Sequence, residues 1–279
     1  MKKNTMTLMA AGTCAMIAAS AANAEVYYST NFGTGYTNGA LVGGGSPQPD
    51  SLGQNGWRQT SSNTATPIQV TNGAAIIGTS GQDVYHAFNR TVDPAAGDTL
   101  YYSASMKVTA AQSTGDFFLF VGDPAGTSTN FFGRLFAKST TGGFLLGIQA
   151  NGGGSSAPVT YGTNALTLNQ TYNVVVAYDS ATGLLNDTFA VYVDPNSTNR
   201  ASLTSYASAA WLTTALAERG LTEIGLRQGN NPSDTPSVSV YSLAAGSSLA
   251  DVGVIPVPAP GAAALVGLAG ILAGRRRRN

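Results

Sequence analysis

The sequence predicts an all-β protein in which two antiparallel sheets stack as a sandwich. Between Tyr27 and Leu243 it consists of short β-rich runs separated by Gly, Asn, Asp, Ser and Pro, which is typical of strands joined by turns. It shows no βαβ alternation and no long amphipathic helix, so a parallel sheet and a helical bundle are disfavoured. With 34 glycines and only 10% charged residues, the composition favours an exported, loop-rich β protein over a cytosolic helical enzyme.

Alternation of apolar and polar residues identifies the individual strands. In the run from Leu100 to Thr109, every second residue is apolar, as in a strand packed on one side. The run from Thr171 to Pro195 reads as a hairpin with its turn at Asp179 to Asp187. Only Trp211 to Glu218 is predicted to be briefly helical. Further strands are expected at Ile68 to Val70, Ala74 to Ile77, Val84 to Phe88, Asp116 to Val121, Phe131 to Lys138, Phe144 to Gln149, Glu223 to Arg227 and Ser237 to Leu243.

The first 24 residues predict a secretory signal peptide with a helical apolar core. Lys2 and Lys3 form a basic start, Leu8 to Ala19 is apolar, and Ala22-Asn23-Ala24 is an A-x-A cleavage site for signal peptidase, with Ala22 and Ala24 at the recognised positions. A lipoprotein signal is the alternative because Cys14 lies inside this segment, but the residues before it fit a lipobox poorly. Cys14 is the only cysteine, so the cleaved protein has no thiol and no disulfide, and its stability depends on its core.

The whole chain has a formal net charge of zero, but the part between its two basic ends, here called the body, is acidic. Six of the 14 basic residues lie at the two ends of the chain, whereas all 14 acidic residues lie between them, so the body has eight basic residues and a net charge of −6. Such a surface repels polyanions, and nucleic-acid binding is therefore not expected.

Residues suited to catalysis are scarce. His86 is the only histidine, so a Ser-His-Asp triad would need it, and no G-x-S-x-G motif accompanies it. Glycoside hydrolysis needs two carboxyl groups about 5 to 9 Å apart. The only glutamates are Glu25, Glu218 and Glu223, and they do not form the E-x-D-x-x-E motif of laminarinase-type glucanases. The sequence therefore predicts a protein that is not an enzyme.

Oxygen-rich loops and aromatic side chains are the remaining candidates for a binding site. Asp179, Asp187 and Asp194 lie in or beside loops that suit a hard cation such as calcium, although Asp is also favoured in turns for backbone reasons. No other cofactor is expected. Three ring-bearing residues are candidates for ligand binding, for example by stacking on sugar rings, with core packing as the alternative. They are Trp57, His86 and Trp211.

The C-terminal segment VPAPGAAALVGLAGILAGRRRRN predicts a short apolar helix followed by a basic cluster. Gly261 to Gly274 would span about 21 Å as a helix, less than the hydrocarbon core of about 30 Å. Positive-inside logic would keep the arginines in the cytoplasm and the body outside. The arrangement indicates a transient transmembrane helix rather than a permanent anchor.

This tail resembles that of the PEP-CTERM exported proteins of Gram-negative and related bacteria, which have a Pro-Glu-Pro motif, an apolar helix and an arginine cluster. The matching positions are Val257, Pro258, Ala259, Pro260 and Gly261, followed by Arg275, Arg276, Arg277 and Arg278, with Ala259 in place of the glutamate. The resemblance implies processing near the prolines by an exosortase-type transpeptidase in the membrane.

The body resembles the laminin-G-like, concanavalin A-type jelly rolls that often precede such tails. The resemblance rests on TYNVVVAYD, NDTFAVYVDP and EIGLRQG, in this order. It implies a sandwich but names no ligand.

Together these patterns divide the chain into a signal peptide (1–24), a β-sandwich domain (25–246), a linker (247–256) and a sorting signal (257–279). They predict an exported protein of the cell surface or extracellular matrix with a non-catalytic structural or adhesive role, linked to exopolysaccharide or biofilm. One alternative is a lectin-like module that binds glycans, and another is a glycoside hydrolase. The expected partners are the export machinery, signal peptidase, an exosortase-type enzyme and extracellular polysaccharide.

Overall fold

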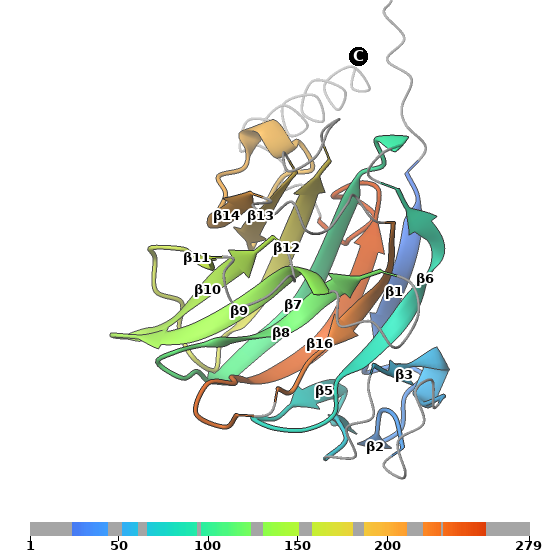
Figure 1. Ribbon diagram of the computed structural model, residues 1–279, viewed down its shortest axis with the longest axis vertical. Coiled ribbons are helices and arrows are strands. Elements are labelled where there is room, and N and C mark those ends of the chain that lie inside the picture. Colours follow the sequence, from blue (N-terminus) through green and yellow to red (C-terminus); the bar gives the residue numbers. More distant parts are fainter. Residues whose placement is uncertain are drawn as a thin grey trace, which may run out of the picture.

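The computed structural model describes residues 24–43, 52–60, 66–93, 96–123, 131–150, 158–180, 187–210, 220–229 and 231–254. They form two antiparallel sheets, which lie one behind the other in Figure 1 and confirm the predicted all-β sandwich. Nearly all of the predicted signal peptide (Ala22 included, Ala24 excepted), the tail from residue 257 onward and Trp211 to Glu218 lie outside the described residues. Among the described residues, no helix has the length and apolar composition needed to span a bilayer.

Sheet A has nine strands in the order β14-β13-β12-β7-β16-β5-β4-β2, with β1 also paired to β16. β5 pairs with the first half of β16 and β1 with the second half, so the two lie end to end along one edge of that strand. The strands of sheet A are β1 (Val26–Asn31), β2 (Gly39–Ala40), β4 (Gln69–Thr71), β5 (Ala74–Ile77), β7 (Leu100–Ala110), β12 (Thr171–Asp179), β13 (Thr188–Val193), β14 (Ala207–Ala210) and β16 (Ser237–Gly246).

Sheet B has seven strands in the order β11-β10-β9-β8-β15-β6-β3. Two short 3-10 turns, η1 (Gln54–Gly56) and η3 (Arg200–Ser202), lie in the connections. The strands of sheet B are β3 (Arg58–Gln59), β6 (Val84–Val92), β8 (Asp116–Gly122), β9 (Phe131–Thr140), β10 (Gly143–Gln149), β11 (Thr160–Tyr161) and β15 (Leu221–Leu226).

The main core lies between the sheets and is built by the predicted alternation. In β7, Leu100, Tyr102, Ala104, Met106 and Val108 all point inward and are at most 1% exposed. Their neighbours along the strand point outward because successive side chains of a strand face opposite ways. Each fully buried aliphatic side chain contributes about 1.5 to 3 kcal/mol, and the chain has no disulfide to add to this.

The segment after β16 differs from its prediction as a linker. Residues 247–254, here called the C-terminal strap, fold back over the outer face of sheet A. Leu249, Val252 and Val254 are buried there against a second apolar cluster that includes Val175 and Tyr192. These apolar side chains make the strap part of the folded domain, because leaving them in water would forfeit their burial energy.

Candidate functional site

Trp57 and His86, two of the three predicted ligand-binding residues, lie next to each other at the edge of the sandwich. Their ring centroids are 5.9 Å apart. Trp57 is fully buried, and its Nε1–H donates to the Tyr36 hydroxyl at 3.0 Å. The prediction that Trp57 presents a face to a ligand is therefore wrong, because the indole belongs to the core. Trp211 lies outside the described residues.

His86 is half-buried and stacks on Tyr28, with ring centroids 4.2 Å apart. It lines a shallow cavity of about 450 Å³ together with Tyr28, Tyr36 and Asn55. Its Nδ1 lies 2.7 Å from the Ala87 carbonyl oxygen and its Nε2 lies 3.0 Å from that of Asn55. Because both ring nitrogens face backbone carbonyls, neither is positioned to activate a serine.

The three candidate calcium ligands are not brought together. Asp187 precedes β13 and Asp194 follows it, so the whole strand separates them. Asp179 forms an ion pair with Arg200, and the buried Asp187 accepts a hydrogen bond from the Tyr178 hydroxyl at 2.5 Å. Asp194 accepts one from the backbone N–H of Asn173 at 2.8 Å. Within the described ranges, no group of three or more His, Cys, Asp or Glu residues could hold a metal ion.

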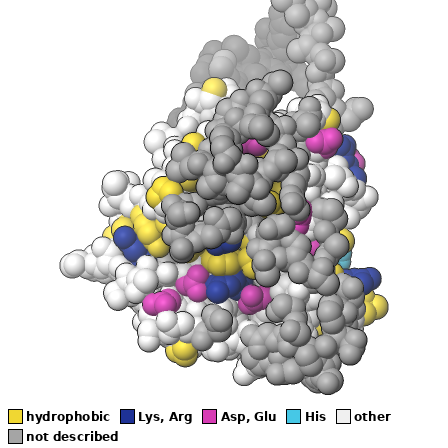
Figure 2. Space-filling model, viewed as in Figure 1, with side chains coloured by type: hydrophobic (Ala, Val, Ile, Leu, Met, Phe, Trp, Pro, Cys, Tyr) yellow, Lys and Arg dark blue, Asp and Glu magenta, His cyan; other side chains and the backbone are white. Residues whose placement is uncertain are grey.

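The outer face of sheet B carries a cluster of aromatic and charged side chains, and Figure 2 shows these types side by side near the middle of the face turned to the viewer. The Phe117 ring contacts two guanidinium groups, those of Arg227 at 4.1 Å and Arg134 at 4.7 Å from its centroid. Burial, and secondarily the charge of Arg227, lowers the pKa of Arg134 to about 10. Lys138 lies 4.0 Å from the centroid of Tyr161, which is an ordinary cation–π distance.

Two carboxylates converge in this cluster, but a guanidinium lies between them. Arg227 contacts Asp116 through Nη1 at 2.5 Å and Asp83 through Nε at 3.7 Å. Burial raises the pKa of Asp83 to about 6, against the opposing charge of Arg227. A glycosidase needs the space between its two carboxyl groups for the sugar. Because Arg227 fills that space, this pair fits an internal ion-pair network better than a hydrolytic site.

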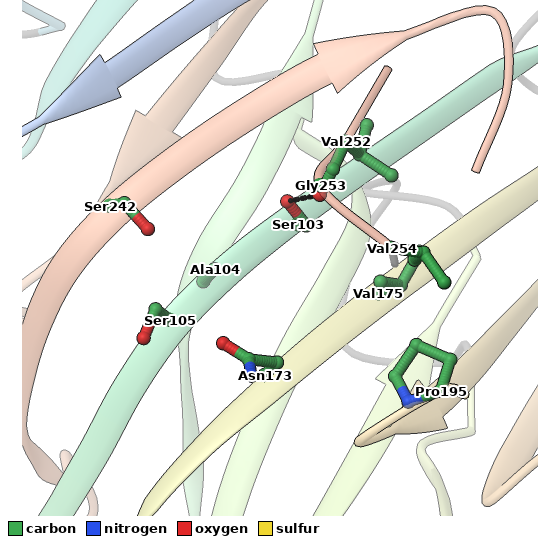
Figure 3. Close-up of a pocket in the computed structure, with 10 residues that line it drawn as sticks. All are labelled: Ser103, Ala104, Ser105, Asn173, Val175, Pro195, Ser242, Val252, Gly253 and Val254. Carbon is green, nitrogen blue, oxygen red and sulfur yellow. Dashed lines mark hydrogen bonds between the residues drawn. The ribbon is translucent and has the colours of Figure 1, made fainter. Parts of the chain in front are cut away.

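A groove crosses the outer face of sheet A, where three neighbouring strands place small polar side chains side by side. In the register of the sheet, Asn173 of β12 pairs with Ser105 of β7, and Ser105 pairs with Ser242 of β16. All three point outward because their neighbours along each strand, such as Ala104 and Val174, belong to the core. The cavity above them has a volume of about 270 Å³, and Figure 3 shows the side chains that line it.

The walls of the groove come from two different segments. The strap contributes Val252 and Val254, and Pro195, just after β13, lies on the same side as Val254 (Figure 3). Ser103 fixes the strap in place, since its hydroxyl donates to the Val252 carbonyl oxygen at 2.9 Å. The lining residues carry no charge. The groove therefore combines a polar floor with apolar walls on a rigid sheet.

The three floor side chains are free to bond a ligand. In the part of the chain that the structure describes, the side chains of Ser105, Asn173 and Ser242 make no hydrogen bond. A hydroxyl both donates and accepts, and an amide offers two donors and one acceptor. The sequence prediction missed these residues because each is an ordinary outward position of its strand, and only the sheet register brings residues 105, 173 and 242 together.

The sequence matches no protein-family model and no curated protein. The fold is similar to several solved structures at low identity. Alginate lyase Aly36B in complex with alginate tetrasaccharide is 14% identical with a TM-score of 0.45, covering 78% of this chain and 95% of that one. The CBM2 module of the evolved Dit of Lactobacillus casei BL23 phage J-1 is 12% identical with a TM-score of 0.45, covering 81% and 96%. The Emp47p carbohydrate recognition domain is 11% identical with a TM-score of 0.42, covering 77% and 96%.

Proposed function

We propose that this protein is an exported, non-catalytic protein that binds neutral polysaccharide at the cell surface or in the extracellular matrix. The groove on the outer face of sheet A is the binding site. The observation that carries the proposal is the row of Asn173, Ser105 and Ser242, three side chains with unused hydrogen-bonding capacity on adjacent strands.

A sugar ring matches this arrangement in chemistry and in size. It presents several hydroxyl groups that both donate and accept, as hydroxyl and amide side chains also do. Its C–H faces suit the apolar walls formed by Pro195 and Val252. A cavity of about 270 Å³ lies near the lower end of the usual range for ligand sites, and it suits one or two sugar units better than a long bound segment.

The absence of charge in the lining of the groove favours a neutral glycan over an anionic one. The net charge of −6 on the body would also repel a polyanion at long range. The cluster on sheet B is less suitable as a binding site, because its charges are already committed to one another. Arg227 contacts both Asp83 and Asp116, and Lys138 lies against Tyr161.

The place where the protein acts is proposed from its two ends. The signal peptide directs export and is cleaved after the A-x-A site at Ala22 and Ala24, and the tail from Val257 to Arg278 directs processing at the membrane by an exosortase-type enzyme. Intact-mass measurement of the protein released at the cell surface tests this part. Loss of both the first 24 residues and the arginine cluster is expected, and a product still ending at Asn279 would contradict the processing.

The binding site is tested with purified protein and immobilised polysaccharides. Neutral glucan, mannan and galactan are the probes, and alginate is the anionic comparator. Asn173→Ala should weaken binding of the neutral polysaccharide about threefold to tenfold, because one uncharged hydrogen bond contributes about 0.5 to 1.5 kcal/mol. Ser105→Leu should abolish binding by filling the groove.

Ser208→Ala is the matched control for these variants. Ser208 is exposed on β14, at the far edge of sheet A, and does not line the groove. Its removal should leave affinity unchanged. Equal binding by wild type and Ser105→Leu would show that the groove is not the site. Preferential binding of alginate would contradict the proposed neutral ligand.

A further inference from the structure

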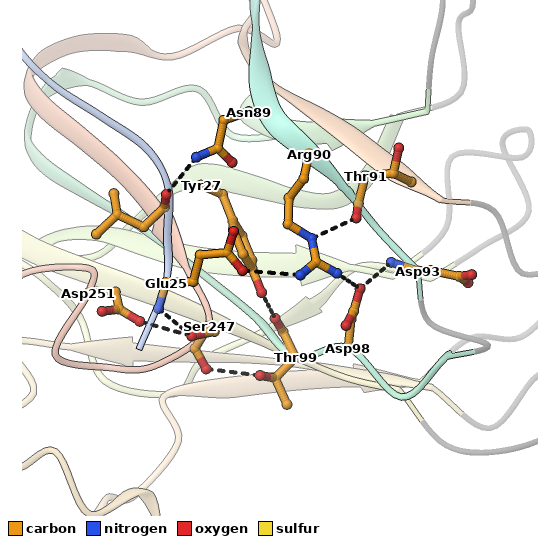
Figure 4. A network of polar contacts seen from close by, with 11 residues as sticks. Glu25, Tyr27, Asn89, Arg90, Thr91, Asp93, Asp98, Thr99, Ser247 and Asp251 are labelled. Carbon is orange, nitrogen blue, oxygen red and sulfur yellow. Dashed lines mark hydrogen bonds and ion pairs between the residues drawn. The ribbon is translucent and has the colours of Figure 1, made fainter. Parts of the chain in front are cut away.

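The backbone nitrogen of Glu25 is held by the C-terminal strap. Its N–H donates to the Ser247 hydroxyl at 2.9 Å, and the N–H of Ser247 donates back to the Glu25 carbonyl oxygen, also at 2.9 Å. These bonds extend the pairing of β1 with β16 by one step, since Val26 is already paired with Gly246. Figure 4 shows Glu25 and Ser247 joined at the start of β1.

The Ser247 hydroxyl is also hydrogen-bonded to the carboxylate of Asp251. It donates to Oδ2 of Asp251 at 3.1 Å, and the Ser248 hydroxyl donates to the same oxygen at 2.7 Å. Asp251 is half-buried and forms no ion pair with a Lys or Arg among the residues that the structure describes. A carboxylate in this setting is incompletely compensated, and a nearby cation would stabilise it.

The side chain of Glu25 points to a different partner. Its carboxylate lies 3.1 Å from Nη1 of Arg90 on β6, and Arg90 also pairs with Asp98 (Figure 4). Arg90 is therefore occupied by Glu25 and Asp98, and it is not the cation that Asp251 lacks. Residue 25 joins the strap through its backbone and sheet B through its side chain.

The nitrogen held by Ser247 belongs to the peptide bond that the predicted signal-peptide cleavage would break. We propose that Glu25 is the N-terminal residue of the mature protein, and that its α-ammonium group is bound in a site formed by Ser247 and Asp251. The proposal depends on the export part of the proposed function and not on glycan binding. It assigns the strap a role as the receptor for the new N-terminus.

The cleavage is a hydrolysis in which water is the only co-reactant. The C–N bond between Ala24 and Glu25 breaks, the oxygen of water bonds to the carbonyl carbon of Ala24, and both protons of the water end up on the nitrogen of Glu25. At neutral pH the products are the carboxylate of Ala24 and the ammonium of Glu25. The nitrogen thus changes from a neutral group with one N–H into a cation with three, beside a carboxylate that lacks a cation.

Two forms of the purified protein test the ammonium site. One begins at Glu25 and the other at Ala22, so that in the second form the Glu25 nitrogen remains a neutral amide. The Glu25 form is expected to be the more stable one. In urea titrations at pH 7 its unfolding equilibrium constant should be about fivefold to tenfold smaller, because a partly buried hydrogen bond that involves a charged group stabilises the folded state by about this factor. High salt should reduce the difference.

Asp251→Asn supplies the decisive comparison, because it keeps the shape of the side chain and removes its charge. The difference between the two forms should fall to less than twofold in this variant and persist in the control Asp234→Asn. Equal stability of the two wild-type forms, or a full difference in Asp251→Asn, would overturn the proposal. N-terminal sequencing of the exported protein should begin at Glu25, and any other start would also overturn it. None of these readouts involves a glycan, so a failure of the groove proposal would be seen separately.

Discussion

Gly225, the glycine of the EIGLRQG run, provides a sharp test of the strand register in sheet B. It lies on β15 directly opposite Phe120 of β8. A Cβ built at this position would lie 2.1 Å from Cζ of Phe120 and 2.6 Å from Cε1 and Cε2. The aromatic ring therefore lies across the glycine, and replacing Gly225 with Ala would force the two together.

The stability lost in Gly225→Ala depends on how tightly the ring of Phe120 is packed. Phe120 is fully buried, and its ring packs against that of Phe131 with the centroids 4.1 Å apart, so it cannot move toward Phe131 or into solvent without losing this packing. Overpacking of this kind costs about 1 to 3 kcal/mol, while the loss of chain freedom in the unfolded state returns about 0.4 to 1 kcal/mol. We expect a net destabilisation of about 1 to 2 kcal/mol.

A double-mutant cycle measured by urea unfolding separates the clash from other effects. Phe120→Ala alone should cost about 3 to 5 kcal/mol, and in that background Gly225→Ala should become neutral or stabilising because its obstacle is gone. Gly43→Ala is the control, since among the described residues, its chain neighbours apart, no atom lies within 4 Å of its Cβ position. Additive free energies in the cycle would refute the contact between Gly225 and Phe120, and with it the register of β8 and β15.

Three further measurements test other parts of the structure. Trp57→Ala should destabilise the protein by about 3 to 5 kcal/mol in the same urea assay because the indole is fully buried, and a loss below 1 kcal/mol would contradict its place in the core. EDTA should leave the Tm unchanged, because Asp179, Asp187 and Asp194 already have partners within the protein, and a drop of several degrees would indicate a metal. The pKa of Asp83 is raised by burial from 3.8 to about 6, so its carboxylate opposes folding above pH 6. As the pH falls from 7 to 4, wild type should therefore gain on the order of 2 to 3 kcal/mol relative to Asp83→Asn, and parallel pH profiles would contradict this.

The long strands could be predicted from the sequence because their pattern is local. The alternation in Leu100 to Thr109 identifies β7 to within one residue, since burial on one face alone produces that period. The short strands β2, β3 and β11 were not predicted, because two residues carry no period and become a strand only through their partners. For the same reason β16 was predicted to end at Leu243, whereas its pairing with β1 extends it to Gly246. The edge strands β1 and β14 were also missed.

The candidate site could not be predicted, because residues 105, 173 and 242 are neighbours only in the folded sheet. No local motif distinguishes an uncommitted serine from any other outward serine of a strand. Trp57 was predicted as a candidate and proved to be a core residue. The sequence around an aromatic residue that follows a turn is the same whether the ring packs in the core or stacks on a sugar. Only its zero exposure separates the two roles. His86 lies within a strand, as the predicted run from Val84 to Phe88 requires.

The pairing of β1 with β16 has a consequence for the order of events during biosynthesis. Glu25 and Ser247 are bonded partners although 222 positions separate them, and β16 lies between β7 on one side and β1 with β5 on the other. The nine-stranded sheet A therefore lacks its internal strand β16 until almost the whole body has been synthesised. Closing such a distant pair is slow, because the entropy of a very long loop must be lost before any contact rewards it. The first strand, β1, therefore cannot take its place in sheet A until the last strand, β16, has been made.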